Sequence, residues 1–157
     1  MVKSNSTTRL FSINEQVILT QTDTTVGFVS QNANALADIK TRPNSKPFIK
    51  VYNSLKSLQD AHKRVPKTQK RLLRRANKST FIVKNEAFRI AAYPLHSNIL
   101  RNLNWVYSTS ANESGKNFDR EFCQSKTDII IEDLNDLEEK TASKLFKINN
   151  KKIKRLR

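Results

Sequence analysis

Short apolar runs, each bounded by polar or turn-forming residues, recur along the whole chain. Runs of this length predict β-strands, and apolar residues at helical spacing predict short helices between them. The predicted strands are Gln16–Leu19, Val26–Val29, Phe48–Tyr52, Ser79–Val83, Phe88–Ala92, Asp128–Ile131 and Leu145–Ile148. The predicted helical segments are Asn34–Ile39, Leu55–Ala61, Thr68–Arg75, part of Pro94–Leu103, and Phe118–Cys123. This alternation favours one α/β domain with a mixed sheet and flanking helices.

Two hydroxyl-rich segments follow apolar runs, and each ends on a glycine. They are Gln21–Gly27 and Ser108–Gly115, and both are expected to be turns. The chain has only two glycines, so each is expected where the backbone takes a positive φ or approaches another group closely. Polar loops after strand ends are the usual ligand platform of α/β sheets. The two segments therefore predict two walls of one polar site.

The chain carries 29 Lys and Arg against 14 Asp and Glu, a net charge of +15 in 157 residues. Such an excess favours polyanionic partners, above all nucleic acids or nucleotide phosphates. One cluster without acidic residues lies between His62 and Lys78, and its cations are Lys63, Arg64, Lys67, Lys70, Arg71, Arg74, Arg75 and Lys78. It is either a footprint for the RNA backbone or a solvated helix face. Because the run holds no aromatic residue, base stacking is not expected there.

Three further basic features have two interpretations each. The loop with Lys40, Arg42 and Lys46 holds two prolines and is either a phosphate clamp or a solvated turn. Arg89 lies between apolar neighbours on a predicted strand, so it is either exposed or directed into a cavity. The basic tail, residues 149–157, either extends a strand or forms a disordered arm.

Composition argues against several other classes of protein. With one cysteine, Cys123, and two histidines, neither an intramolecular disulfide nor a cysteine zinc cluster is expected. Cys123 is expected to be an ordinary thiol, and His96 a surface or capping residue. No secretory signal or membrane-length apolar run is visible, so a soluble cytoplasmic protein is expected. The whole chain, 1–157, is predicted as a single domain with a polar lead-in over residues 1–12.

Four strings in this order resemble the YrdC/YciO-like family of threonylcarbamoyl-AMP synthases and their relatives, over about Val17 to Ile148. The strings are Thr22-Asp23-Thr24 with Gly27, then Lys40-x-Arg42-Pro43-x-x-Lys46-Pro47, then Arg89, then Ser108-Thr109-Ser110-Ala111-Asn112-x-Ser114-Gly115. The second and fourth strings together are specific, although either alone would be weak. The resemblance implies a twisted α/β fold with a concave, positively charged cavity.

The resemblance also implies an activity. Family synthases use L-threonine, bicarbonate and ATP with Mg²⁺, and release threonylcarbamoyl-adenylate and pyrophosphate for modification of an adenosine in tRNA. It assigns ATP binding to Lys40, Arg42, Thr80, Asn112 and Arg155, and threonine binding to Thr22, Arg89, Ser110 and Ser143. Mg²⁺ would arrive with the nucleotide, and no protein metal site is expected. Expected partners are tRNA or double-stranded RNA and the proteins that complete the tRNA modification, but no membrane.

The chain also departs from the family's pattern at several positions. Gln21 stands where the family has proline, Val26 where it has tyrosine, and Thr41 where it has glycine. A Pro-Gly-Pro segment is replaced by Ala76-Asn77-Lys78. These departures leave a second function open, namely a diverged member that binds double-stranded RNA or tRNA without full synthase activity.

Overall fold

A computed structural model describes residues 12–41, 47–91 and 94–157. Arg42, Lys46 and residues 1–11 of the predicted lead-in lie outside the described residues, as does Ala92 at the end of a predicted strand. The strands are β1 Ile18–Gln21, β2 Val26–Ser30, β3 Ile49–Tyr52, β4 Ser79–Val83, β5 Glu86–Ile90, β6 Trp105–Ser110, β7 Ile129–Ile131, β8 Lys144–Ile148 and β9 Ile153–Arg155. The helices are η1 Ile13–Glu15, α1 Ala33–Lys40, α2 Leu55–Asp60, η2 Lys67–Gln69, α3 Lys70–Arg75, α4 Pro94–Leu103 and α5 Arg120–Ser125.

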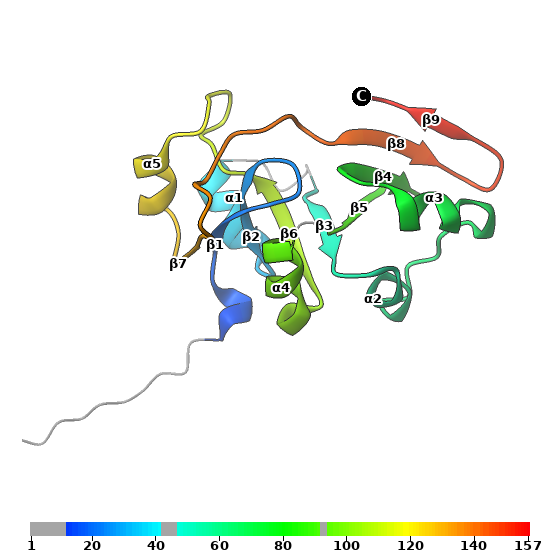
Figure 1. Cartoon of the computed structure of the whole chain (residues 1–157), viewed down its shortest axis with the longest axis horizontal. Coiled ribbons are helices and arrows are strands. Elements are labelled where there is room, and N and C mark those ends of the chain that lie inside the picture. The colour runs from blue at the N-terminus through cyan, green and yellow to red at the C-terminus, as the bar shows by residue number, and fades with distance from the viewer. Residues whose placement is uncertain (1–11, 42–46, 92–93) are drawn as a thin grey trace, which may run out of the picture.

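The strands form one nine-stranded mixed sheet in the order β7-β1-β2-β6-β3-β5-β4-β8-β9. Parallel pairing joins β1 to β7, β3 to β5 and β4 to β8. The remaining pairs, such as β2 with β6 and β8 with β9, are antiparallel. The predicted single α/β domain with a mixed sheet and flanking helices is therefore confirmed (Figure 1).

The helices cover the two faces of the sheet unequally. On one face, called the cavity face below, Val51 and Val106 pack against Leu100 and Leu103 of α4. On the opposite face, α1 and α5 cover β1 and β2, while α2 and α3 cover β4 and β5. Since strand side chains alternate between faces, the register places Arg89 on the cavity face with Val51, its partner residue.

Several predicted elements differ from the structure in extent. Ser108, Thr109 and Ser110 continue strand β6 and pair with β2, so the turn begins only at Ala111. The predicted strand Asp128–Ile131 begins only at Ile129, and although the run is apolar, Ile130 is 43% exposed because β7 is an edge strand. The prediction of one helix over Thr68–Arg75 was wrong at its start, because Thr68 and Gln69 belong to the 3-10 helix η2.

The basic tail ends in ordered structure. Its two alternatives were strand extension and a disordered arm, and β9 decides for the strand, since Lys154 pairs with Lys147 of β8. The β9 side chains are exposed and mostly cationic, a composition that protects an edge strand from pairing with other chains. Within the described part of the chain, no helix is both long and apolar enough to cross a membrane.

Candidate functional site

A cavity of about 330 Å³ lies on the cavity face, beyond the cover of α4. It is lined by residues from the Gln21–Gly27 turn, from β3, β5 and β6, and from the C-terminal region. The lining residues are Thr22, Thr24, Thr25, Pro47, Ile49, Arg89, Ser108, Thr109, Ser110, Ala142, Ser143 and Arg157. The two hydroxyl-rich segments therefore contribute to one polar cavity, as their composition predicts.

The Gln21–Gly27 turn is closed by its own hydrogen bonds. The Thr22 hydroxyl donates to the Thr25 carbonyl at 2.6 Å, and the Thr22 amide donates to the same oxygen at 3.1 Å. Gly27 allows the turn to lie against β6, because a Cβ there would meet Thr22 Cγ2 at 2.9 Å and the Thr109 carbonyl at 3.0 Å. The other glycine, Gly115, takes a positive φ of 81°. Gly27 thus meets the expected requirement for a close approach, and Gly115 meets the one for a positive φ.

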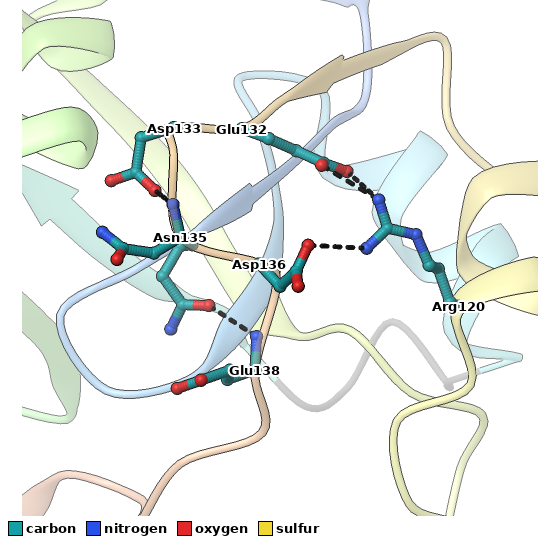
Figure 2. Close-up of polar contacts among 7 residues, drawn as sticks. Arg120, Glu132, Asp133, Asn135, Asp136 and Glu138 are labelled. Atoms are coloured by element: carbon teal, nitrogen blue, oxygen red, sulfur yellow. Dashed lines mark hydrogen bonds and ion pairs between the residues drawn. The ribbon is translucent and has the colours of Figure 1, made fainter.

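The acidic segment between β7 and β8 holds the same turn from outside. The Gln21 side chain, which stands in place of the family's proline, accepts the Glu138 amide at 3.0 Å. In return, the Val26 amide donates to the Glu138 carbonyl at 3.1 Å. Figure 2 shows how Arg120 anchors the start of this segment through Glu132, at 2.6 Å. The segment then continues to Ala142 and Ser143 in the cavity wall.

Arg89 is the buried cation of the cavity, with only 5% of its surface exposed. Its Nε and Nη2 donate to the Thr80 hydroxyl at 3.2 and 3.0 Å, and its Nη1 donates to the Thr24 hydroxyl at 2.9 Å. Burial lowers the pKa of the guanidinium, the charge of Asp23 raises it, and the charge of Arg157 lowers it further. Of the two interpretations of Arg89, the structure supports the cation directed into a cavity.

Arg89 is oriented by the Thr80 hydroxyl, which in turn lies beside the hydroxyl of Ser143. The Thr80 hydroxyl is fully buried, lies 2.9 Å from the Ser143 hydroxyl, and accepts the Arg89 fork described above. Thr80 itself does not line the cavity, whereas Ser143 does. Thr80 is therefore placed to orient Arg89 rather than to touch a ligand in the cavity.

Lys40 lies at the end of α1 and binds the end of β6. Its Nζ donates to the Ser110 carbonyl at 3.2 Å, to the Asn112 carbonyl at 2.5 Å and to Asn112 Oδ1 at 2.8 Å. The Ser110 hydroxyl donates to the same Oδ1 at 2.7 Å. The structure thus brings Lys40, Ser110 and Asn112 together beside the cavity, with Lys40 only 6% exposed.

The helix that carries Lys40 has defined ends. The Asn32 side chain caps its first turn by accepting the Asn34 and Ala35 amides. At the other end, Thr41 is in the left-handed conformation, with φ 47° and ψ 41°. Glycine is the usual residue for such a C-cap, which is the residue that the family pattern has here. Thr41 therefore takes a backbone conformation that glycine adopts at a lower energetic cost.

The late arginine of the cavity is Arg157 and not Arg155. Arg155 pairs with Phe146 across β8 and β9, and Phe146 pairs with Phe81. This register puts Arg155 on the face opposite Arg89. Arg157 lies beyond the end of β9, lines the cavity and donates from Nε to the Ser143 carbonyl at 3.1 Å. Nothing local in the sequence distinguishes the two arginines.

The predicted RNA cluster lies away from the cavity. Arg64, Lys67, Arg71, Arg74, Arg75 and Lys78 are exposed, and Lys63 and Lys70 are half-buried. Lys63 forms an ion pair with Glu86 at 2.6 Å. Since α3 packs on the face opposite the cavity, the cluster cannot share a pocket with Arg89.

The described residues contain neither a cluster of metal ligands nor an accessible thiol. Within residues 12–41, 47–91 and 94–157, no group of three or more His, Cys, Asp or Glu side chains could hold a metal ion. The Cys123 thiol is fully buried in the core, and burial raises its pKa. A buried thiol with a raised pKa is a poor nucleophile.

A family model matches almost the whole chain. The family model for Sua5, YciO and YrdC, described as "Telomere recombination", matches residues 13–157, and the chain belongs to this family. A search of curated protein sequences finds no match.

The chain is also similar to solved structures. A double variant of P. abyssi Sua5 superposes with a TM-score of 0.76 at 19% identity, covering 90% of this chain and 52% of that one. P. abyssi Sua5 complexed with L-threonine gives 0.72 at 18%, covering 90% and 50%. E. coli YciO gives 0.72 at 18%, covering 91% and 82%. The chain spans about half the length of the Sua5 proteins. At these low identities, the TM-scores show a shared fold and nothing more.

Proposed function

We propose that the protein is an L-threonylcarbamoyladenylate synthase, which converts L-threonine, bicarbonate and ATP into threonylcarbamoyl-AMP and pyrophosphate. Family membership supports this proposal, as does the complex of P. abyssi Sua5 with L-threonine. The observation that carries it is Arg89. Its hydrogen bonds among the described residues go to neutral hydroxyl groups, although it is buried beside a polar cavity.

A guanidinium in this setting favours an anionic ligand. Arginine presents a planar fork that matches a carboxylate, and each charge-assisted bond contributes about 1.5–3 kcal/mol. The carboxylate of threonine would complete the coordination of Arg89, with the hydroxyl groups of Thr22 and Ser110 nearby in the same cavity. Arg157 supplies a second cation, which suits the phosphates of ATP.

The chemistry requires positioning rather than a protein nucleophile. The amine of threonine attacks bicarbonate, and a carbamate forms as a C–O bond of bicarbonate breaks and water leaves. A carbamate oxygen then attacks the α-phosphorus of ATP, and the bond to the pyrophosphate leaving group breaks. Fixed cations and hydroxyl donors lower the barrier by orienting both reactants and stabilising the charge on phosphate. A cavity lined by hydroxyls and cations offers few ligands for Mg²⁺, so the ion would arrive bound to the nucleotide and would neutralise its phosphates.

The direct test is pyrophosphate release by the purified chain. Release is expected only when ATP, threonine and bicarbonate are all present. Arg157→Ala should raise the KM for ATP, whereas Arg155→Ala, two residues away on the opposite face, serves as the matched control and should not. Release that does not depend on threonine would refute the synthase proposal.

The second candidate is an RNA-binding member of the family without full synthase activity. The exposed cations of α3 and its flanks favour it. For a polyanion, the logarithm of the binding constant should fall with the logarithm of salt concentration by about 0.7–0.9 per phosphate contacted. An affinity for RNA that does not change with salt would exclude this function.

A further inference from the structure

A second pocket, of about 210 Å³, lies on the sheet face opposite the proposed substrate cavity. We call it the aromatic pocket, after its lining by Phe48, Tyr52, Phe88 and Tyr107 together with Lys50 and Lys63. The register confirms the face, because Lys50 pairs with both Phe88 and Tyr107 while Arg89 pairs with Val51. None of the residues assigned to threonine or ATP lines this pocket.

The aromatic rings hold the Lys50 ammonium within the pocket wall. Lys50 Nζ lies 3.6 Å from the ring centroid of Trp105, 5.7 Å from that of Tyr107 and 5.9 Å from that of Tyr52. Trp105 and Tyr107 meet edge to face, with centroids 5.1 Å apart. Burial lowers the pKa of Lys50, the charge of Lys63 lowers it further, and the charge of Glu86 raises it. An electron-rich ligand group beside the ammonium would offset the effect of Lys63.

The pocket offers hydrogen-bonding groups of both kinds. Lys50 is a donor, and the Glu86 carboxylate, which is paired with Lys63 at 2.6 Å, is an acceptor at the rim. A phosphate or a lipid chain would have no use for a carboxylate. A nucleobase has flat apolar faces and an edge with both donors and acceptors, so it matches rings, ammonium and carboxylate together. The pocket volume of about 210 Å³ lies below the roughly 300–1,000 Å³ of pockets for drug-sized ligands. It therefore suits a ligand group of the size of a single base.

The aromatic pocket opens into a basic groove. Its neighbour, a cavity of about 300 Å³, shares Lys63, Glu86 and Phe88 with it and adds Arg64 and Lys84. A third cavity, of about 530 Å³, shares Arg64 and Lys84 and continues to Lys67. Cations spaced along a groove that leads from an aromatic pocket are the arrangement that binds the backbone of a single strand while stacking its bases.

We propose that this groove binds single-stranded RNA, with one unpaired base in the aromatic pocket and the phosphates along Arg64, Lys67 and Lys84. The proposal deepens the second candidate function, since it names the strand state and the recognising pocket. The run from His62 to Lys78 has no aromatic residue of its own, so the proposal places the stacked base outside that run. The fold, however, brings Tyr107 and Phe48, distant in sequence, beside the start of that run.

The test measures the affinity of the full chain for a labelled oligoribonucleotide of about 12 nucleotides, single-stranded or annealed to its complement. Single strands should bind more tightly than the duplex at equal salt. Tyr107→Leu should weaken single-strand binding about 5- to 150-fold, the loss expected for one base–aromatic stack. Tyr107→Phe keeps the ring and should bind like the unaltered chain. Equal affinity for both strand states, or no effect of Tyr107→Leu, would overturn the proposal.

A second measurement needs no variant. The chain has one tryptophan, Trp105, in contact with Lys50 and Tyr107. Its fluorescence should change when single-stranded RNA is added and should not change with duplex at matched occupancy. An unchanged signal during single-strand binding would place the RNA elsewhere. Pyrophosphate release should survive Tyr107→Leu, because Tyr107 lies on the opposite face from the substrate cavity, so failure of one proposal leaves the other testable.

Discussion

Arg89→Lys is the substitution that separates a binding role from a structural one. Lysine keeps a positive charge near Asp23 but replaces the planar fork with a single ammonium group. In the present structure the fork makes bonds of 3.2 and 3.0 Å to Thr80 and 2.9 Å to Thr24. Thr80 would still have the Ser143 hydroxyl as a partner at 2.9 Å.

The expected magnitudes follow from these contacts. Loss of one charge-assisted bond to the threonine carboxylate costs about 1.5–3 kcal/mol, so the KM for threonine should rise about 10- to 150-fold. The KM for ATP should change little. The free energy of unfolding without ligand should fall by about 1.5–3 kcal/mol for each bond that the lysine does not replace, because the bonds come from a charged group.

Urea denaturation with and without L-threonine provides a measurement independent of turnover. At a threonine concentration about 100 times the dissociation constant, binding raises the free energy of unfolding by about 2.7 kcal/mol. If Arg89→Lys weakens binding about 100-fold, the same concentration raises it by only about 0.4 kcal/mol. Full threonine stabilisation in the variant would refute the carboxylate assignment. A selective rise in the KM for ATP would move Arg89 to the nucleotide.

Three further substitutions test particular features of the fold. Thr41→Gly should raise the free energy of unfolding by about 1 kcal/mol in urea denaturation, because Thr41 occupies a left-handed C-cap; a loss of stability would contradict this. Gly27→Ala should destabilise by about 1–3 kcal/mol in the same assay, since its Cβ would meet Thr22 at 2.9 Å and the Thr109 carbonyl at 3.0 Å. The third concerns Tyr52, whose buried hydroxyl has no hydrogen-bond partner among the described residues and whose pKa burial raises to about 12. In the unfolded chain the tyrosine hydroxyl loses its proton from about pH 10. The Tyr52 contribution to the free energy of unfolding should therefore be complete below pH 10 and fall by up to about 2.7 kcal/mol as the pH rises to 12. Tyr52→Phe should abolish that part of the pH dependence and leave the free energy of unfolding at neutral pH unchanged or higher.

Local sequence patterns were sufficient to predict most of the strands and helices and the two hydroxyl-rich walls of the cavity. Alternation and run length are local properties, so most strands were predicted within a few residues of their observed bounds. The two rare glycines marked both polar segments, because each meets a backbone requirement that other residues satisfy poorly. Together with Lys40 and Arg89, these segments were sufficient to identify the family from motifs alone.

Tertiary structure alone decided which residues meet. Arg155 and Arg157 are alike in sequence. The pairing of β9 with β8 puts Arg155 on the face opposite the cavity, whereas Arg157 reaches the cavity because it lies beyond the end of β9. Likewise, only the order of the sheet places Tyr107 and Lys50 beside Lys63. Strand pairing joins segments distant along the chain, and a shift of one residue in register exchanges the two faces. Which side chains share a face in the two proposed sites therefore depends on the pairing of distant strands, which cannot be read from any one segment of the sequence.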